Sequence, residues 1–325
     1  MDGFNKEKSL QLKGLAIVFM FWLHLYGHDK LIQNGNYYTE LWGGVTKFLL
    51  ELFHICVPIF LFIAGYGAAI KHKHSKPLAM KICSLYKKIW IVAIVFFPLV
   101  FFLGKLEFHA GELLLNLSGF YFTYCGEWWF IGLYVLLEIY IYALEKIGIS
   151  NNIIALIVLS GGLMVAGYAL KVVDPSVTKI NTVQWIPYTF LIKQPIFVSG
   201  YICNKMGVFN KPVVKKYGIW GIIFWGVLFV DIPESFYMPF VVPCLVAAFC
   251  CIPICKVINK FLLILGKNST YMWLTHSWLI YKFLQPVVYG LHDVVANLIV
   301  LLVIDFIVAY GFKRVEMCID KYCCK

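Results

Sequence analysis

The sequence predicts an all-α integral membrane protein, a bundle of about ten transmembrane helices with both termini in the cytoplasm. Three features predict this class: an apolar composition, a series of apolar runs, and a one-sided distribution of basic residues. Hydrophobic residues make up 61% of the 325 residues and charged residues 14%, and the mean hydropathy is +0.80. Soluble globular chains carry roughly 25% charged residues. A chain of this length cannot hide so much apolar surface in a water-soluble core, so its solvent must be lipid.

Ten apolar segments follow one another between charged residues and Pro-, Gly- or Asn-rich punctuation. Each is expected to span the membrane once, since a helix needs about 20 apolar residues to cross a hydrocarbon core. They are residues 10–27, 48–70, 89–103, 127–147, 153–170, 185–203, 217–230, 237–255, 261–284 and 294–312. The stretch 112–124 is apolar but too short to span, so we expect an interfacial or re-entrant piece. Residues 1–325 then form a single membrane domain, and we expect no soluble domain.

The basic residues gather on one side of these segments. With a cytoplasmic N-terminus, 21 of the 28 Lys and Arg residues lie on the inner side, six lie in outer loops and Lys193 lies within a span. Cytoplasmic loops carry such an excess of Lys and Arg, so both termini are expected inside. The same rule explains the basic run at residues 71–76 first as an orientation signal, with a ligand site as the second interpretation.

Composition also argues against several other classes. The basic residues form no stripe interleaved with aromatics, so the net charge of +11 does not indicate a nucleic-acid partner. The 11 cysteines lack metal-ligand spacing such as C-x-x-C, and some lie inside apolar runs, so we expect neither a disulfide framework nor a zinc site. Lysine outnumbers arginine 27 to 1, which is typical of an AT-rich bacterial genome. We therefore expect a multi-pass protein of a bacterial plasma membrane.

Some charged or titratable side chains fall within the predicted spans or at their edges. A charge there is costly unless it has a partner, a water-filled cavity or a functional role. These residues are Lys13, His24, Glu51, His54, Glu127, Glu138, Lys193, His276 and Asp305. For Glu138, Lys193 and Asp305 a structural interpretation is equally good, in which they pair across helices and fix the bundle.

Lys13 and His24 share one face of the first predicted span. Eleven residues turn an α-helix through about 1100°, about 20° beyond three full turns, and rise about 16 Å. One face thus carries a cation at the cytoplasmic edge and an imidazole beyond mid-membrane. His28 follows His24 at a spacing that can hold a metal, but no nearby carboxylate completes a ligand set, so we expect no metal site.

Four of these side chains fall at a similar depth, in the outer half of the bilayer: His24, His54, Glu127 and His276. Each histidine alone is more often a satisfied polar residue than a catalyst. Three imidazoles and a carboxylate at one depth nevertheless favour an acid–base site.

Segments around these residues resemble the motifs of the membrane acyltransferase 3 family, whose members move acyl groups, usually acetyl from acetyl-CoA, onto cell-surface carbohydrates. Residues 12–24 resemble its first-span motif, a basic residue followed by histidine after ten intervening positions. The stretches VPIFLFIAGY at 57–66, EWWF at 127–130 and GKNSTYMWLTH at 266–276 are similar to its second-span, fourth-span and late-span motifs. In order and spacing the matches run along nearly the whole chain.

The motifs and the intramembrane charges together provide the site candidates. The catalytic candidates are His24, Glu127 and His276, the donor-binding candidate is Lys13, and the further candidates are His54, Trp129, Lys193 and Ser269. With the activity that the resemblance implies, His24 is the general base that deprotonates a sugar hydroxyl as it attacks a thioester, and Glu127 or His276 assists. Transfer through an acyl-histidine intermediate is the open alternative.

The resemblance also implies the partners. No cofactor is bound, acyl-CoA (usually acetyl-CoA) is the co-substrate, and a carbohydrate or lipid-linked glycan is the acceptor. Lys13 stands where the family usually has Arg, so donor phosphate would meet a point charge instead of a bidentate guanidinium. Ala64 stands where the family often has Ser, which removes one hydroxyl. Some members carry an extracellular esterase-like domain; here we expect any such partner to be a separate protein, and a homo-oligomer stays open.

The intramembrane charges also fit a second class of protein, a transporter or flippase that moves a glycan or small polar solute without covalent chemistry. Such charges mark substrate paths through membranes as well as catalytic sites. The two halves of the sequence show no clear repeat. Mass spectrometry of the surface polymer separates the two classes.

Overall fold

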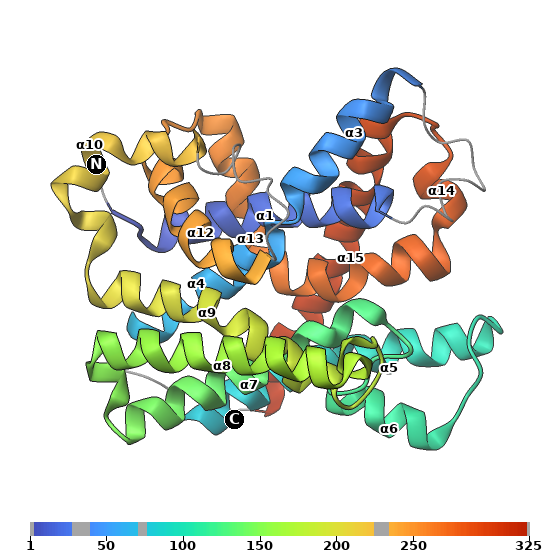
Figure 1. The fold of residues 1–325 in the computed structure, drawn as a ribbon. Helices are drawn as coiled ribbons and strands as arrows, with labels where there is room; N and C mark the ends of the chain where they lie inside the picture. The colour runs from blue at the N-terminus through green and yellow to red at the C-terminus, as the bar shows by residue number, and fades with distance from the viewer. Residues whose placement is uncertain (1–2, 28–39, 71–76, 224–233, 324–325) are drawn as a thin grey trace. The chain divides into compact units, whose positions relative to one another are not determined.

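The computed structural model describes residues 3–27, 40–70, 77–223 and 234–323, and its regular structure in these ranges is helical, with no strand (Figure 1). The all-α prediction is confirmed. The chain divides into two compact units, each assembled from separate stretches of sequence. The first unit comprises Met1–Ser9, Pro58–Cys83 and Ala110–Ile254, and the second comprises Leu10–Val57, Ser84–His109 and Cys255–Lys325.

The first unit contains nearly all of α4 and the helices of the middle of the chain. Its helices are α4 (Cys56–Ile70), α6 (Ala110–Ser118), α7 (Trp129–Lys146), α8 (Ile153–Val173), α9 (Trp185–Lys205), α10 (Pro212–Tyr217) and α12 (Glu234–Cys251). Its short 3₁₀ turns are η2 (Gly126–Trp128), η3 (Ile149–Asn151), η4 (Pro175–Thr178), η5 (Val208–Asn210) and η6 (Gly218–Trp220).

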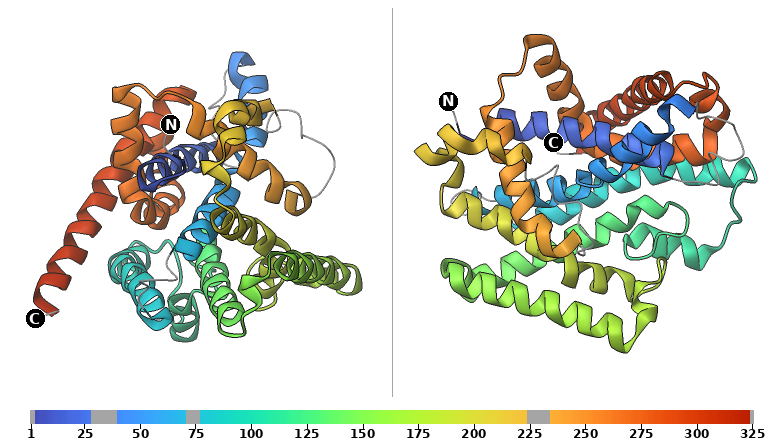
Figure 2. Two further views of the ribbon diagram at one scale, coloured as in Figure 1. Left: turned by 90° about the vertical axis from the view of Figure 1, so that its left-hand side faces the viewer. Right: turned by 45° about the horizontal axis from the view of Figure 1, so that its top comes forward.

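The second unit contains most of α1 and α5 together with the C-terminal helices. Its elements are α1 (Lys6–Tyr26), α3 (Glu40–Phe53), α5 (Leu78–Phe102), α13 (Lys256–Trp278), the π-helical turn η7 (Leu279–Phe283), α14 (Gln285–Tyr289) and α15 (Val294–Cys323). Figure 2 shows α15 as one long helix that leads to the C-terminus.

Six helices in the described part of the chain are long and apolar enough to cross a membrane. They are Lys6–Tyr26, Gly43–Ile70, Leu78–Phe102, Gly126–Lys146, Ile153–Val173 and Val294–Tyr322. They coincide with six of the ten predicted segments, which supports a multi-pass membrane protein. Three other predicted spans lie on α9, α12 and α13, and the fourth, 217–230, extends beyond the described residues. The ten-span count and the cytoplasmic termini stay predictions.

Two local features differ from straight spanning helices. The predicted span 48–70 breaks at His54–Ile55, between α3 and α4. Pro58 explains the break, because it has no N–H to offer the carbonyl of His54 and its ring crowds that carbonyl. The apolar stretch 112–124 contains the end of the nine-residue helix α6, followed by a turn at Gly119 with φ +74°. It is too short to cross a bilayer, as expected, and its interfacial position stays a prediction.

In each unit, a pair of glycines lets two helices touch through their backbones. In the first unit a Cβ on Gly65 of α4 would collide with the carbonyl of Phe197 on α9, and one on Gly200 of α9 would collide with the carbonyl of Phe62. In the second unit Gly14 of α1 and Gly266 of α13 face backbone carbonyls in the same reciprocal way. Small residues at crossings are typical of membrane helix packing, where close approach replaces a hydrophobic driving force.

Candidate functional site

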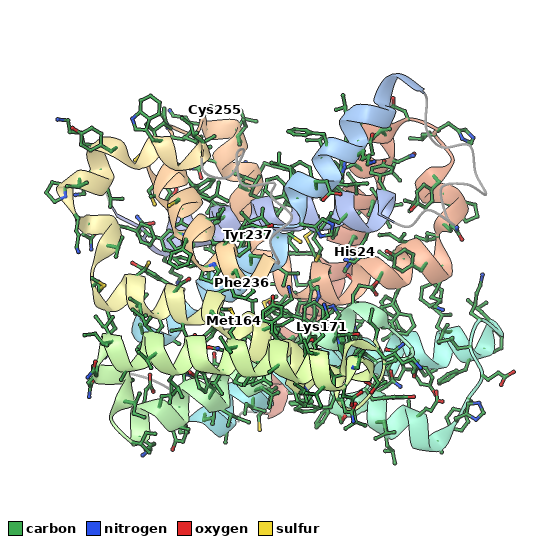
Figure 3. The ribbon with its side chains drawn as sticks, in the orientation of Figure 1. His24, Met164, Lys171, Phe236, Tyr237 and Cys255 are labelled. Atoms are coloured by element: carbon green, nitrogen blue, oxygen red, sulfur yellow. The ribbon has the colours of Figure 1, made fainter. Side chains whose placement is uncertain are left out.

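The C-terminal turn of α1 is capped by two tyrosines from late in the chain. The last carbonyls of a helix have no N–H partner within the helix. Tyr281 Oη donates to the carbonyl of His24 at 3.0 Å, and Tyr289 Oη donates to the carbonyl of Leu25 at 2.7 Å. These bonds fix the end of α1, and with it His24, within the second unit. His24 is labelled in Figure 3.

Tyr281 also contacts the side chain of His24. Its hydroxyl oxygen lies 3.1 Å from His24 Nδ1. Tyr281 belongs to the π-helical turn η7, in which Leu284 N donates to the carbonyl of Leu279, five residues back, at 2.8 Å. π-Helical turns are frequent at functional sites. Tyr281 is not among the residues predicted from the sequence, because neither hydropathy nor periodicity signals a π turn inside an apolar run.

His276 is the second imidazole of the cluster. Its ring centroid lies 4.8 Å from that of His24, and it stacks on Phe21 with centroids 5.3 Å apart. The side chain is fully buried, and its Nδ1–H donates to the carbonyl of Trp273 at 2.7 Å. Among the described residues its Nε2 has no hydrogen-bond partner. The structure thus brings together two of the three catalytic candidates.

Further buried polar groups lie on α13 and α15. Thr275 Oγ1 lies 2.5 Å from Asp305 Oδ1 and 2.8 Å from the carbonyl oxygen of Tyr271, and Asp305 is fully buried. Within the described ranges, Asp305 Oδ2 and both polar atoms of the Asn297 amide lack partners. Buried polar atoms are nearly always bonded, so such atoms point to water or a ligand.

Comparison with known families decides the class of this protein. A family model described as an acyltransferase domain matches residues 10–314, nearly the whole chain. The chain belongs to the acyltransferase 3 family. The resemblance of the four motifs is therefore confirmed, and the protein is an acyltransferase. No curated protein and no solved structure gives a significant match.

The acyltransferase 3 motifs in the second unit contain residues that serve helix packing as well as the candidates for donor binding and catalysis. Lys13, half-buried, is followed by Gly14 at the crossing of α1 and α13, and α1 continues without a break to His24. Ser269, a site candidate, is buried, and its Oγ donates to the carbonyl of Gly266 at 3.0 Å. This hydrogen bond within α13 satisfies the buried hydroxyl of Ser269, so no ligand is needed to explain it.

Three candidates lie in the first unit, whereas the two imidazoles belong to the second. Glu127, in the 3₁₀ turn η2, accepts from Cys125 Sγ at 3.8 Å. Trp129 begins α7 and packs edge-on against Phe130, with ring centroids 5.9 Å apart. Lys193 is half-buried within α9. Their roles stay predictions of the sequence.

His54 is exposed in the break between α3 and α4, and its ring shows no bond or ring contact within the described part of the chain. Its site role stays a prediction. His28, which raised the possibility of a histidine pair, and the basic run 71–76 lie outside the described residues. In the ranges that the structure describes, His, Cys, Asp and Glu side chains form no group of three that could hold a metal.

Proposed function

We propose that this acyltransferase moves an acyl group, normally acetyl, from cytosolic acyl-CoA to a hydroxyl of a cell-surface or lipid-linked carbohydrate, with His24 as the general base. Family membership supports the reaction class. The observation that carries the residue assignment is the pair of imidazoles, His24 and His276, at the C-terminal ends of two helices with centroids 4.8 Å apart. Histidine changes charge near neutral pH, which suits proton transfer.

Lys13 is the proposed contact for the donor. It lies on α1 three helical turns before His24, a separation of about 16 Å along the helix. This distance is similar in order of magnitude to the extended pantetheine arm of coenzyme A. With the N-terminal end of α1 towards the cytosol, the ammonium would hold the donor phosphates while the thioester reaches the imidazole.

The proposed reaction is a direct acyl transfer. His24 removes the proton of the sugar hydroxyl, whose oxygen attacks the thioester carbonyl and forms a tetrahedral intermediate. Collapse of this intermediate breaks the C–S bond, and the departing thiolate takes the proton back from the imidazolium. The products are an O-acylated sugar and free CoA thiol, and the histidine is returned to its neutral form.

The C-terminal ends of two helices stabilise the positive charge that an imidazole acquires when it takes up the proton in this reaction. His24 and His276 lie in the last turns of α1 and α13. The negative end of a helix dipole stabilises a nearby cation by roughly 0.3–1 kcal/mol. We assign His276 the role of orienting the hydroxyl or passing on its proton through Nε2, the buried atom that the described residues leave without a partner. Glu127 is a further candidate for assistance.

Purified protein with acetyl-CoA tests the proposal. Thiol release is measured over a panel of acceptors: exopolysaccharide, teichoic acid and lipid-linked repeat units. His24→Ala should lower acceptor-dependent release by about 100-fold or more, the usual contribution of a general base. His109→Ala, at an exposed histidine whose side chain is 58% exposed, is the matched control and should keep the wild-type rate. Persistent transfer by His24→Ala at normal abundance contradicts the assignment.

Mass spectrometry of the surface polymer separates transfer from transport. Cells with the protein should show an acyl increment that is lost on deletion and on His24→Ala. A polymer of unaltered composition whose export changes on deletion would instead identify a transporter.

A further inference from the structure

We propose that Tyr281 is a positioning residue that holds His24 in the tautomer in which Nε2 is the base. This inference rests on the proposed role of His24 and names the group that orients it. It starts from the two contacts of one hydroxyl, with the carbonyl of His24 at 3.0 Å and with His24 Nδ1 at 3.1 Å.

The hydroxyl of Tyr281 has a single proton, so it can donate only once. His24 lies in the last turn of α1, and its carbonyl, which can only accept, takes the tyrosine proton. Towards Nδ1 the hydroxyl can then only accept. His24 Nδ1 must therefore carry a proton, and in the neutral ring the lone pair lies on Nε2.

This arrangement does what a general base requires. A base must present an unprotonated nitrogen in a fixed direction, and the hydrogen bond at the other ring nitrogen determines which nitrogen that is. Tyr281 contacts both the main-chain carbonyl and the ring of His24. The bond to the carbonyl keeps the tyrosine hydroxyl in place, so a rotation of the imidazole would break the hydrogen bond between that hydroxyl and Nδ1.

The π-helical turn helps to place Tyr281. In a regular α-helix, residue 281 would lie about 500° round the axis from His276, and therefore about 140° away from its face. The bond from Leu284 N to Leu279 O, at 2.8 Å, shows five-residue winding, which turns each residue through a smaller angle. His276 and Tyr281, on successive elements, thus both contact the side chain of His24.

The same helix end offers a matched control. Tyr289 Oη donates to the carbonyl of Leu25 at 2.7 Å, the residue after His24, and Tyr289 is fully buried. Phe at position 281 or 289 removes one tyrosine hydroxyl and one cap from α1. Only Tyr281→Phe also removes the contact with the imidazole.

Kinetics and nitrogen NMR test the inference. With acetyl-CoA and an acceptor that supports release by the wild type, Tyr281→Phe should lower kcat by about 10- to 100-fold and leave the KM for acetyl-CoA within about twofold, because proton transfer and not donor binding is affected. Tyr289→Phe should keep kcat within about threefold. In protein labelled with δ1-¹⁵N-histidine, at a pH where the ring is neutral, the His24 signal should be that of a protonated nitrogen in the wild type and in Tyr289→Phe. A His24→Asn difference spectrum assigns that signal.

Several outcomes would overturn the inference. The first is an unprotonated His24 Nδ1 in the wild type, and the second is a wild-type kcat in Tyr281→Phe. The third is an equal loss of kcat in Tyr281→Phe and Tyr289→Phe, which would mean that Tyr281 acts only by capping the end of α1. The wild-type spectrum decides the tautomer even if Tyr281→Phe fails to accumulate. Full activity of His24→Ala would refute the proposed function, whereas loss in His24→Ala with a wild-type Tyr281→Phe would refute only the inference.

Discussion

In the first unit the buried charged and amide side chains all have hydrogen-bond partners among the described residues, whereas in the second unit several such side chains have atoms without one. Glu138, only 3% exposed, pairs with Lys81 at 3.1 Å and accepts from Tyr134 Oη at 2.8 Å. Gln194 and Ser160 exchange two hydrogen bonds between α9 and α8, at 2.7 and 2.8 Å. The structural interpretation of Glu138, a charge that pairs across helices, is therefore confirmed.

The second unit differs in this respect. His276 Nε2, Asp305 Oδ2 and the amide of Asn297 are buried without partners in the part of the chain that the structure describes. An unsatisfied buried polar group costs roughly 1–3 kcal/mol, so a fold keeps such groups where water or a ligand completes them. The first unit thus uses its buried charged and amide groups for stability, whereas the second keeps several such groups available for binding and chemistry. Neutral donors without a partner among the described residues occur in the first unit too, on Tyr140, Trp185 and Thr189.

The largest effect on stability is expected from breaking the ion pair of the first unit. Lys81→Met leaves the buried carboxylate of Glu138 without its cation and should lower the free energy of unfolding by about 3–5 kcal/mol. The measurement is thermal unfolding in detergent, together with abundance in membranes. Lys87→Met is the control, because Lys87 and Asp320 are 32% and 49% exposed and such pairs contribute about 1 kcal/mol or less. Glu316, the second partner of Lys87 at 3.4 Å, keeps its closer pair with Lys88 at 2.6 Å. Equal losses in the two variants would contradict the comparison.

A smaller effect on stability, similar in the two units, is expected from substituting the glycines at which two helices cross. Ala at Gly200 or Gly266 puts a methyl group against a backbone carbonyl, so the helices must separate, at about 1–3 kcal/mol. Ala at Gly67, on α4, meets no atom within 4 Å and should be neutral or stabilising by up to about 1 kcal/mol. Unfolding in detergent compares all three variants. If only one crossing responds, the two units do not share this packing device.

Part of this architecture could be predicted from the sequence. Hydropathy predicts α1 as a helix, and the spacing of Lys13 and His24 depends only on helical geometry. The predicted span begins at residue 89, whereas the helix that contains it, α5, begins at Leu78. Its first turns carry lysines, whose low hydropathy is typical of a loop between spans. Two of them, Lys81 and Lys87, are neutralised by carboxylates distant in sequence, which no local pattern reveals.

For the contacts of His24, too, one partner could be predicted from the sequence and another could not. Depth along the spans predicted that His24 and His276 could meet, because depth follows from residue counting. Tyr281 could not be predicted, since its contact depends on the π-helical turn and on the carbonyl of His24 at the end of α1. The partner of Asp305 is also a finding of the structure: it is the hydroxyl of Thr275, a neutral group.

The smallest effect on stability is expected at Asp305, and it tests the comparison most sharply. Asp305→Asn keeps the size of the side chain and a group that can bond to Thr275 Oγ1, so the free energy of unfolding should change by less than about 1 kcal/mol. A double-mutant cycle that combines Thr275→Val with Asp305→Ala, a change that does remove the bond, measures the coupling between the two side chains, which is expected to be about 0.5–1.5 kcal/mol. A loss of about 3 kcal/mol or more in Asp305→Asn would mean that the carboxylate is bound by a cation, as Glu138 is by Lys81. The second unit would then use its buried charge as the first unit does, and the division between a stabilising and a reactive unit would fail.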